Sequence, residues 1–327
     1  MSDRGLLIGD IGGTNARFAL TDGTSKTFSE IAKLKCADFE SADVAIRHYL
    51  ETVGADTPLA ICLAAAGPIV DERVRFTNNP WVIVAGDLRT SFPGATVQLL
   101  NDFEAIAYSI PLLESDDCLA IGLPLAEGLA ADGYTVGVLG PGTGLGAVGL
   151  LKHGELVLPV AGEASHGGFA PETQVQLEIL TALRERFDRV STERLVSGPG
   201  IENLYWAITQ IHGERRTQLS AAEIFAAAIE HSDGLAAETV QMFFEILGQF
   251  AGDFALALGA EDGIFIAGGI VRRYPDLITN SSFRAGFERK GRHRSLMEKI
   301  PTQLILHEQP GLLGASYCAA RLAEVSG

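Results

Sequence analysis

Several kinds of segment are missing from this 327-residue sequence, and each absence excludes a class of protein. No apolar run reaches the roughly 18 residues that a membrane-spanning helix needs. The first ten residues, MSDRGLLIGD, lack the basic region and the cleavage site of a signal peptide. The cysteines are few and lack metal-binding spacing, so we expect a cytoplasmic protein with reduced, mostly buried thiols. These residues are Cys36, Cys62, Cys118 and Cys318.

Positive charge is also scarce. Lysine and arginine number 25 against 41 aspartates and glutamates, which gives a formal net charge of −16. A nucleic-acid partner requires concentrated basic residues, so we expect none. A small anionic ligand is still possible, because backbone N–H groups bind phosphate without any lysine.

Two common nucleotide-binding motifs are absent or incomplete. A P-loop needs a lysine after glycine, and no lysine follows a glycine in this chain. Residues 142–147 match GxGxxA, but the sequence that follows, VGLLKHGELVL, predicts a hairpin with Gly154 at its turn. A dinucleotide site needs a helix at that place, so the match carries no weight.

The pattern of apolar residues predicts an α/β protein in which one hairpin arrangement occurs twice. Strands at 5–9 and 16–21 are joined by DIGGTN, and residues 134–151 repeat the order of strand, glycine-rich turn and strand. Further strands are expected near 27–31, 59–67, 96–102 and 263–271. Helices are expected at 40–52, from Phe103, and at 173–187, 199–211, 221–231 and 235–258, and a strand and a helix end the chain. A length of 327 residues without a linker indicates two tightly packed lobes.

The two hairpin tips, 12–14 and 142–144, are rich in glycine. Glycine allows a tight turn and lets a ligand approach the backbone amides. A plain hairpin turn is the alternative for either tip, but together they favour a phosphate site. Asp10 then stands where a Mg²⁺ ion on those phosphates needs an oxygen ligand, directly or through water.

Seven motifs in order resemble those of the ATP-dependent glucokinases of proteobacteria, in the actin–hexokinase superfamily. They are GDIGGTNARFAL, LNDFEAIA, GPGTGLG, GEASHGGFAP, STERLVSGPG, FIAGGIV and QPGLLGA, and the resemblance extends from residue 6 to about 316. The resemblance implies a two-lobed, ribonuclease H-like α/β fold with the active site in the cleft between the lobes. We expect a small lobe of residues 1–110 plus 311–327 and a large lobe of residues 111–310. It also implies a homodimer.

The resemblance assigns the nucleotide-binding residues. It places the ATP phosphates on the two tips: Gly9, Asp10, Ile11, Gly12, Gly13, Thr14, Gly142, Thr143 and Gly144. Gly268 and Gly269 would lie against the adenosine, although the same pair also fits a strand end capped by glycine. Asp10 would meet the Mg²⁺ of MgATP, through water.

The resemblance also assigns the sugar-binding residues: Asn101, Asp102, Glu163, His166 and Glu193. Asp102 would be the general base, although its position before FEAIAYSI also suits a helix N-cap. Glu193 alone would be interpreted as a first-turn helix carboxylate. No further ligands accompany Glu163 and His166 at zinc spacing. Trp81 is expected in a structural turn and is given no role.

The expected reaction is transfer of the γ-phosphoryl group of ATP to the 6-hydroxyl of D-glucose. The first alternative is a kinase for another hexose. A sugar-sensing regulator on the same fold is a second, but a first strand near residue 5 leaves no room for a DNA-binding motif. A filament-forming nucleotide binder is a third, and it would not need the sugar-binding residues.

Overall fold

The computed structural model describes residues 5–22, 28–76, 79–125 and 128–326, which form two compact units. The first unit takes both ends of the chain, up to Glu114 and from His307 onward. The second unit is the continuous segment Ser115–Leu306. Each unit combines sheet and helix, so the predicted α/β class is confirmed.

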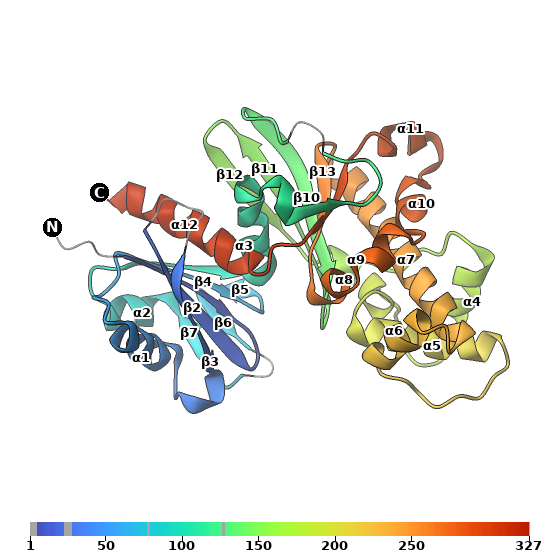
Figure 1. Ribbon diagram of the computed structural model, residues 1–327, viewed down its shortest axis with the longest axis horizontal. Helices are drawn as coiled ribbons and strands as arrows, with labels where there is room; N and C mark the ends of the chain where they lie inside the picture. The colour runs from blue at the N-terminus through green and yellow to red at the C-terminus, as the bar shows by residue number, and fades with distance from the viewer. Residues whose placement is uncertain (1–4, 23–27, 77–78, 126–127, 327) are drawn as a thin grey trace. The chain divides into compact units, whose positions relative to one another are not determined.

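The first unit is built on a five-stranded sheet in the order β3-β2-β1-β4-β8, with β1, β4 and β8 parallel. A three-stranded sheet, β5-β6-β7, accompanies it. Figure 1 shows α12, the last helix, lying beside α3. The elements are β1 (Leu6–Ile11), β2 (Asn15–Thr21), β3 (Ser29–Lys35), α1 (Ala42–Val53), β4 (Ala60–Ala65), β5 (Ile69–Val70), β6 (Arg73–Arg75), β7 (Val82–Val84), α2 (Ala85–Ser91), β8 (Thr96–Asn101), α3 (Asp102–Ser109) and α12 (Pro310–Ser326).

Apart from Asp10, strand β1 is apolar because both of its faces are buried. Leu7 and Ile11 point into one core, and Leu6 and Ile8 point into the core on the opposite face. Gly9 lies between Leu7 and Ile11, where a Cβ would stand 2.7 Å from Leu63 Cδ2. Close packing therefore requires glycine at position 9.

The first hairpin tip is fastened from outside the hairpin. The Asn79 side chain donates to the Gly12 carbonyl at 3.2 Å, and the Cys36 N–H donates to the Thr14 carbonyl at 3.0 Å. Asn79 also accepts from the Trp81 N–H, and the buried Trp81 indole donates to the Phe39 carbonyl. Trp81 is therefore a core residue that supports the segment on which the tip rests.

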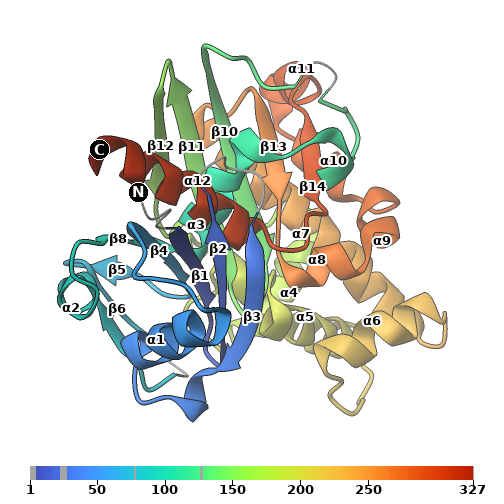
Figure 2. The same ribbon diagram turned by 60° about the vertical axis from the view of Figure 1, so that its left-hand side comes forward.

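The second unit is built on a six-stranded sheet in the order β12-β11-β10-β13-β14-β9. Figure 2 shows β12, β11, β10 and β13 side by side in that order. The elements are β9 (Cys118–Ala120), β10 (Gly133–Pro141), β11 (Leu145–His153), β12 (Leu156–Ala161), α4 (Gln174–Leu183), α5 (Gly198–Ile211), α6 (Ala221–Ile229), α7 (Gly234–Leu258), β13 (Gly263–Ile266), α8 (Gly269–Arg273), α9 (Pro275–Thr279), α10 (Phe283–Glu288), α11 (Arg294–Met297) and β14 (Thr302–Ile305).

The two main sheets share one topology. In the first sheet, β1 and β2 form an antiparallel hairpin, β3 extends it and β4 pairs in parallel with β1. In the second sheet, β10, β11, β12 and β13 repeat this arrangement, and β9 adds an edge strand beside β14. The predicted repetition of a hairpin-opening unit is confirmed. The predicted hairpin with its turn at Gly154 is also confirmed, so the GxGxxA match leads into strand β11 and not into a helix.

The prediction of one strand over 263–271 is wrong beyond Ile266. Strand β13 ends there, Gly268 adopts φ +101°, and α8 begins at Gly269. A Cβ at Gly268 would stand 2.4 Å from the Pro141 carbonyl oxygen, which only glycine avoids. Apolar character gave no sign of this change, because Ile270 and Val271 also suit a short helix.

Among the described helices, none combines the length and the apolar character that crossing a bilayer requires.

Candidate active site

Two carboxylates stand near the carboxyl ends of parallel strands in the first unit. Asp10 is the penultimate residue of β1, and Asp102 directly follows β8. Strand β4 runs between these strands and ends in small residues, Ala64 and Ala65. The carboxyl edge of a parallel sheet is the usual place for a ligand in α/β proteins, and small residues there leave room for one.

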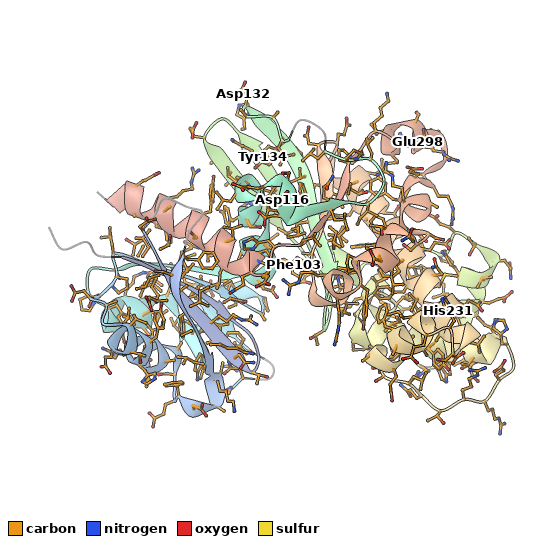
Figure 3. The ribbon with its side chains drawn as sticks, viewed as in Figure 1. Phe103, Asp116, Asp132, Tyr134, His231 and Glu298 are labelled. Atoms are coloured by element: carbon orange, nitrogen blue, oxygen red, sulfur yellow. The ribbon has the colours of Figure 1, made fainter. Side chains whose placement is uncertain are left out.

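Asn101, rather than Asp102, caps helix α3. The Asn101 side chain accepts from the Phe103 N–H at 2.9 Å, and the Glu104 carboxylate accepts from the Asn101 N–H at 2.8 Å. Figure 3 labels Phe103. The Asn101 amide also donates to the Gly67 carbonyl at 3.0 Å, and its second N–H has no partner among the described residues. The capping role weighed for Asp102 thus belongs mainly to its neighbour.

Asp102 is partly exposed, yet its surroundings disfavour ionisation. Burial raises the pKa of the Asp102 carboxyl to about 6, the Phe103 N–H opposes that rise, and the nearby Asp10 carboxylate adds to it. A carboxyl group with this pKa is ionised at neutral pH and binds a proton far better than an ordinary aspartate. It therefore has the chemistry of a general base.

Asp10 is paired with a residue that sequence reasoning missed. The Arg17 guanidinium lies 3.3 Å from Asp10 Oδ2, because Asp10 and Arg17 face each other in the β1–β2 ladder. Burial raises the pKa of Asp10, while Arg17 acts in the opposite direction. The hairpin register around the 12–14 tip was the signal that could have found this pair.

Each hairpin tip offers backbone donors. The N–H groups of Gly13 and Thr14 have no hydrogen-bond partner in the described part of the chain, and neither have those of Thr143 and Gly144. In both tips a neighbouring N–H closes the turn instead, from Gly12 to Asn15 and from Gly142 to Gly144. Such free amides are the groups that bind phosphate oxygens.

The second unit brings Glu163, His166 and Glu193 together. His166 Nε2 lies 3.8 Å from Glu163 Oε2 and 3.9 Å from Glu193 Oε1. Glu163 and His166 are one turn apart in a short 3₁₀ helix and are 75% and 54% exposed, so both can meet a ligand. The three side chains form a cluster of hydrogen-bonding groups open to solvent.

Glu193 also contacts the second hairpin tip. Its Oε2 accepts from the Leu145 N–H at 3.0 Å, and a Cβ on Gly144 would stand 2.5 Å from the same oxygen. A Cβ on Gly142 would meet nothing within 4 Å. One carboxylate thus joins the tip assigned to ATP with the residues assigned to sugar, which the sequence did not indicate.

The remaining predicted nucleotide residues, Gly268 and Gly269, lie where β13 ends and α8 begins. Gly269 is open, since a Cβ there would meet no atom within 4 Å. The described residues contain no cluster of three or more His, Cys, Asp or Glu side chains that could hold a metal.

Comparison with known proteins matches residues 7–322 to the family model described as Glucokinase. A glucokinase of Caulobacter sp. (strain K31) is 42% identical over 312 residues, covering 95% of this chain and 93% of the relative. The crystal structure of glucokinase from an Antarctic psychrotroph is 34% identical, with a TM-score of 0.89 and coverage of 98% of this chain and 100% of that chain. A ROK family glucokinase from Streptomyces griseus, solved with glucose and AMPPNP, has a TM-score of 0.62 at 18% identity, covering 97% of this chain and 99% of that chain. At that identity the likeness concerns the fold alone.

Proposed function

Because this chain belongs to the glucokinase family, we propose that it transfers the γ-phosphoryl group of ATP to the 6-hydroxyl of D-glucose with Asp102 as general base. The products are glucose 6-phosphate and ADP. Family membership supports the reaction. The observation that supports the role of Asp102 is a carboxylate with a pKa of about 6 at the carboxyl edge of the sheet, beside Asp10.

In this mechanism Asp102 accepts the proton of the attacking hydroxyl as the new O–P bond forms. Phosphoryl transfer needs little covalent help, so catalysis is mostly positioning and stabilisation of charge. A base that binds its proton with a pKa near 6 can both take it up at neutral pH and release it after the transfer.

The sugar is held through its other hydroxyl groups. Glu163 and Glu193 each provide an acceptor within 4 Å of the His166 ring nitrogen, and Asn101 keeps one amide N–H without a partner among the described residues. A site that pairs each hydroxyl rejects sugars that lack one, because a buried group is then left unpaired.

MgATP is the second substrate. The free N–H groups at 13–14 and 143–144 suit its phosphate oxygens. Magnesium bound to ATP keeps phosphate and water ligands, so it needs at most one or two protein carboxylates. Asp10 fits that need, because Arg17 contacts only Oδ2 and Oδ1 has no partner among the described residues.

The deciding experiment measures glucose-dependent ADP release by the purified chain and by its Asp102→Asn variant. We expect kcat to fall at least about 100-fold, as is usual when a general base is lost, with a smaller effect on glucose binding. Asp87→Asn is the matched control, since Asp87 is also a first-turn helix carboxylate of the first unit. An Asp102→Asn enzyme within about tenfold of the wild-type kcat would refute the base assignment. A panel of hexoses and phosphoryl donors in the same assay defines the specificity.

A further inference from the structure

The loop that carries Glu163 and His166 has little regular structure of its own. Between β12 and α4 it contains only the 3₁₀ turn at Ala164–His166. Both side chains are largely exposed, so packing does not fix them. Their geometry must therefore come from whatever holds the loop backbone.

The backbone of this loop is hydrogen-bonded to the segment that leads to Glu193. The Thr192 N–H donates to the Gly167 carbonyl at 3.1 Å, and the Phe169 N–H donates to the Val190 carbonyl at 3.0 Å. The loop at 163–170 and the segment at 190–193 therefore behave as one piece, which we name the sugar ledge. It carries all three of the proposed sugar-binding side chains of the second unit.

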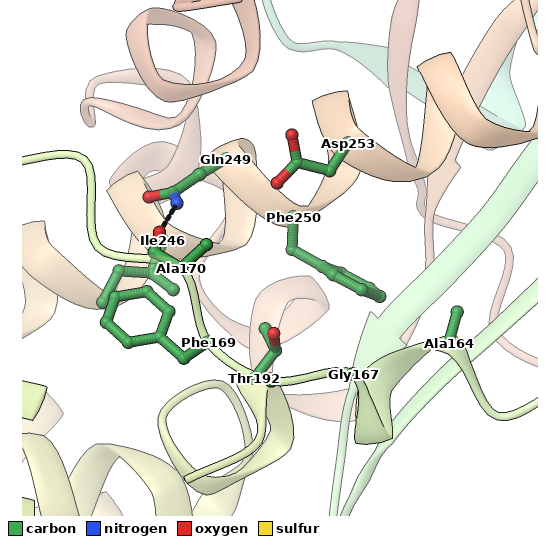
Figure 4. Close-up of a pocket in the computed structure, with 10 residues that line it drawn as sticks. Ala164, Gly167, Phe169, Ala170, Thr192, Ile246, Gln249, Phe250 and Asp253 are labelled. Carbon is green, nitrogen blue, oxygen red and sulfur yellow. Dashed lines mark hydrogen bonds between the residues drawn. The ribbon is translucent and has the colours of Figure 1, made fainter.

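A cavity of about 180 Å³ separates the sugar ledge from helix α7 (Figure 4). Ala164, Gly167 and Thr192 line it on the ledge side, and Ile246, Phe250 and Asp253 line it on the helix side. Phe169 of the ledge is buried in the same hydrophobic core as Ile246 and Phe250 of α7, so apolar packing holds one part of the ledge. Across the cavity, where side chains do not fill the space, polar contacts contribute to the separation of ledge and helix.

Two buried side chains supply those contacts. Gln249, 4% exposed, donates from Nε2 to the Ala170 carbonyl at the end of the ledge (Figure 4). The Lys290 side chain, 5% exposed, places Nζ 3.0 Å from Glu172 Oε1 and 2.8 Å from Asp253 Oδ1. Lys290 thereby ties the segment just after the ledge to α7.

Helix α7, which carries Gln249, is in backbone contact with α10, and Lys290 follows two residues after the end of α10. A Cβ at Gly248 of α7 would stand 1.9 Å from the Phe283 carbonyl oxygen, and a Cβ at Gly286 of α10 would stand 2.3 Å from that of Glu245. Helices this close leave no room for sliding. Gln249 therefore lies on a firmly packed helix, and Lys290 lies close to the same contact.

We propose that Gln249 and Lys290 are positioning residues that hold the sugar ledge, relative to helix α7, in the position required for glucose binding. The inference rests on the proposed function, since it concerns the sugar site of that reaction. Neither residue is given contact with the sugar. Each acts through the backbone or carboxylate of the 170–172 segment.

The kinetic experiment compares Gln249→Met with the wild-type enzyme. Methionine keeps the length and volume of glutamine but cannot donate to Ala170. We expect the KM for glucose to rise about tenfold, with kcat and the KM for ATP within about threefold, as for a modest displacement of a binding group. Gln303→Met is the matched control, because Gln303 is a buried glutamine of the same unit on β14. It should leave the KM for glucose unchanged.

A second pair of variants covers the case in which Gln249→Met is poorly folded. Lys290→Met should raise the KM for glucose in the same way, and Lys290→Arg, which keeps charge and donors, should recover at least half of the loss. A folded Gln249→Met or Lys290→Met enzyme whose KM for glucose stays within twofold of the wild type would overturn the proposal.

Amide hydrogen exchange gives a readout that does not need the reaction. In the unliganded Gln249→Met protein, peptides covering 162–172 should exchange at least fivefold faster, while those covering 134–151 should not change. Unchanged exchange at 162–172 would count against the anchor. A wild-type chain without glucose turnover would refute the proposed function instead, and the exchange result would still decide the anchor.

Discussion

The surroundings of Asp102 disfavour ionisation of its carboxyl group, and a role as general base would explain such an environment. Burial and the neighbouring Asp10 both raise its pKa, and Asn101 rather than Asp102 is the N-cap of α3. An aspartate that served only as a cap would gain from being ionised and would have a lowered pKa. The direction of the shift therefore favours proton transfer over capping.

This shift predicts the pH dependence of the reaction. A base works only when ionised, so kcat/KM for glucose should fall about tenfold per pH unit below about pH 6 and level off above it. An unperturbed aspartate would keep the rate level to a much lower pH. The measurement is a pH–rate profile of kcat/KM. Histidines ionise in the same range, so the control is His166→Gln, whose kcat/KM should still fall below about pH 6. A wild-type profile of kcat/KM with its midpoint below about pH 5 would contradict the assignment of Asp102.

The two glycines of the second hairpin tip should differ in their effects. A Cβ on Gly144 would displace the Glu193 carboxylate, so Gly144→Ala should raise the KM for glucose about tenfold. A Cβ on Gly142 would meet no atom within 4 Å, so Gly142→Ala should keep the KM for glucose within twofold of the wild-type value. Steady-state kinetics with both substrates tests this pair. If both variants changed the KM for glucose equally, the effect of Gly144→Ala would not come from displacement of Glu193.

At the scale of elements, the first unit depends on a close contact between helices α3 and α12. A Cβ at Gly314 of α12 would stand 1.6 Å from the Ala105 carbonyl oxygen and 2.9 Å from the Ser109 N. Backbone atoms cannot move aside as a flexible side chain can. Glycine at 314 is therefore a condition for the helix to lie against α3 (Figure 1).

We predict that Gly314→Ala lowers the free energy of unfolding by about 2 kcal/mol, as overpacking of a core typically does. Gly86→Ala is the control, because Gly86 is a helical glycine of the same unit with no atom within 4 Å of an added Cβ. That substitution should be neutral or stabilising by up to about 1 kcal/mol. Urea denaturation measures both variants. A Gly314→Ala protein as stable as the Gly86→Ala protein would contradict the predicted close contact.

At the scale of the whole molecule, the two units differ in continuity. The second is one segment with its own core, whereas the first needs both ends of the chain. Leu312, Ala315 and Ala319 of α12 cover the apolar face formed by residues of β1 and β4. Without α12 that face would be exposed to water.

This difference predicts how fragments behave. A fragment of residues 115–306 should fold cooperatively, and a fragment of residues 1–114 should not fold until a peptide of residues 307–327 is added. Circular dichroism and thermal melting of each fragment, alone and mixed, provide the test. A cooperative melt of 1–114 by itself would contradict the shared core. The lobe boundaries at 110 and 310, the homodimer and the cytoplasmic location stay predictions.

Much of this protein was determined by sequence alone, because the signals are local. Alternation and apolar runs predict the two hairpins, several buried strands and the long helix α7, and glycine clusters mark both tips. The family resemblance assigns the site residues, and the comparisons confirm the family over residues 7–322. Such features need only neighbouring residues to be recognisable.

Other features depend on contacts between distant residues, and only the tertiary structure decided them. Among these are the capping by Asn101 in place of Asp102, the contact of Glu193 with the 142–144 tip, and the helix at Gly269 that replaced a predicted strand. The Gln249 anchor joins residues 79 positions apart. A glutamine on an apolar helix gives no sequence sign of the carbonyl it will meet, because that partner is set by how α7 packs against the loop.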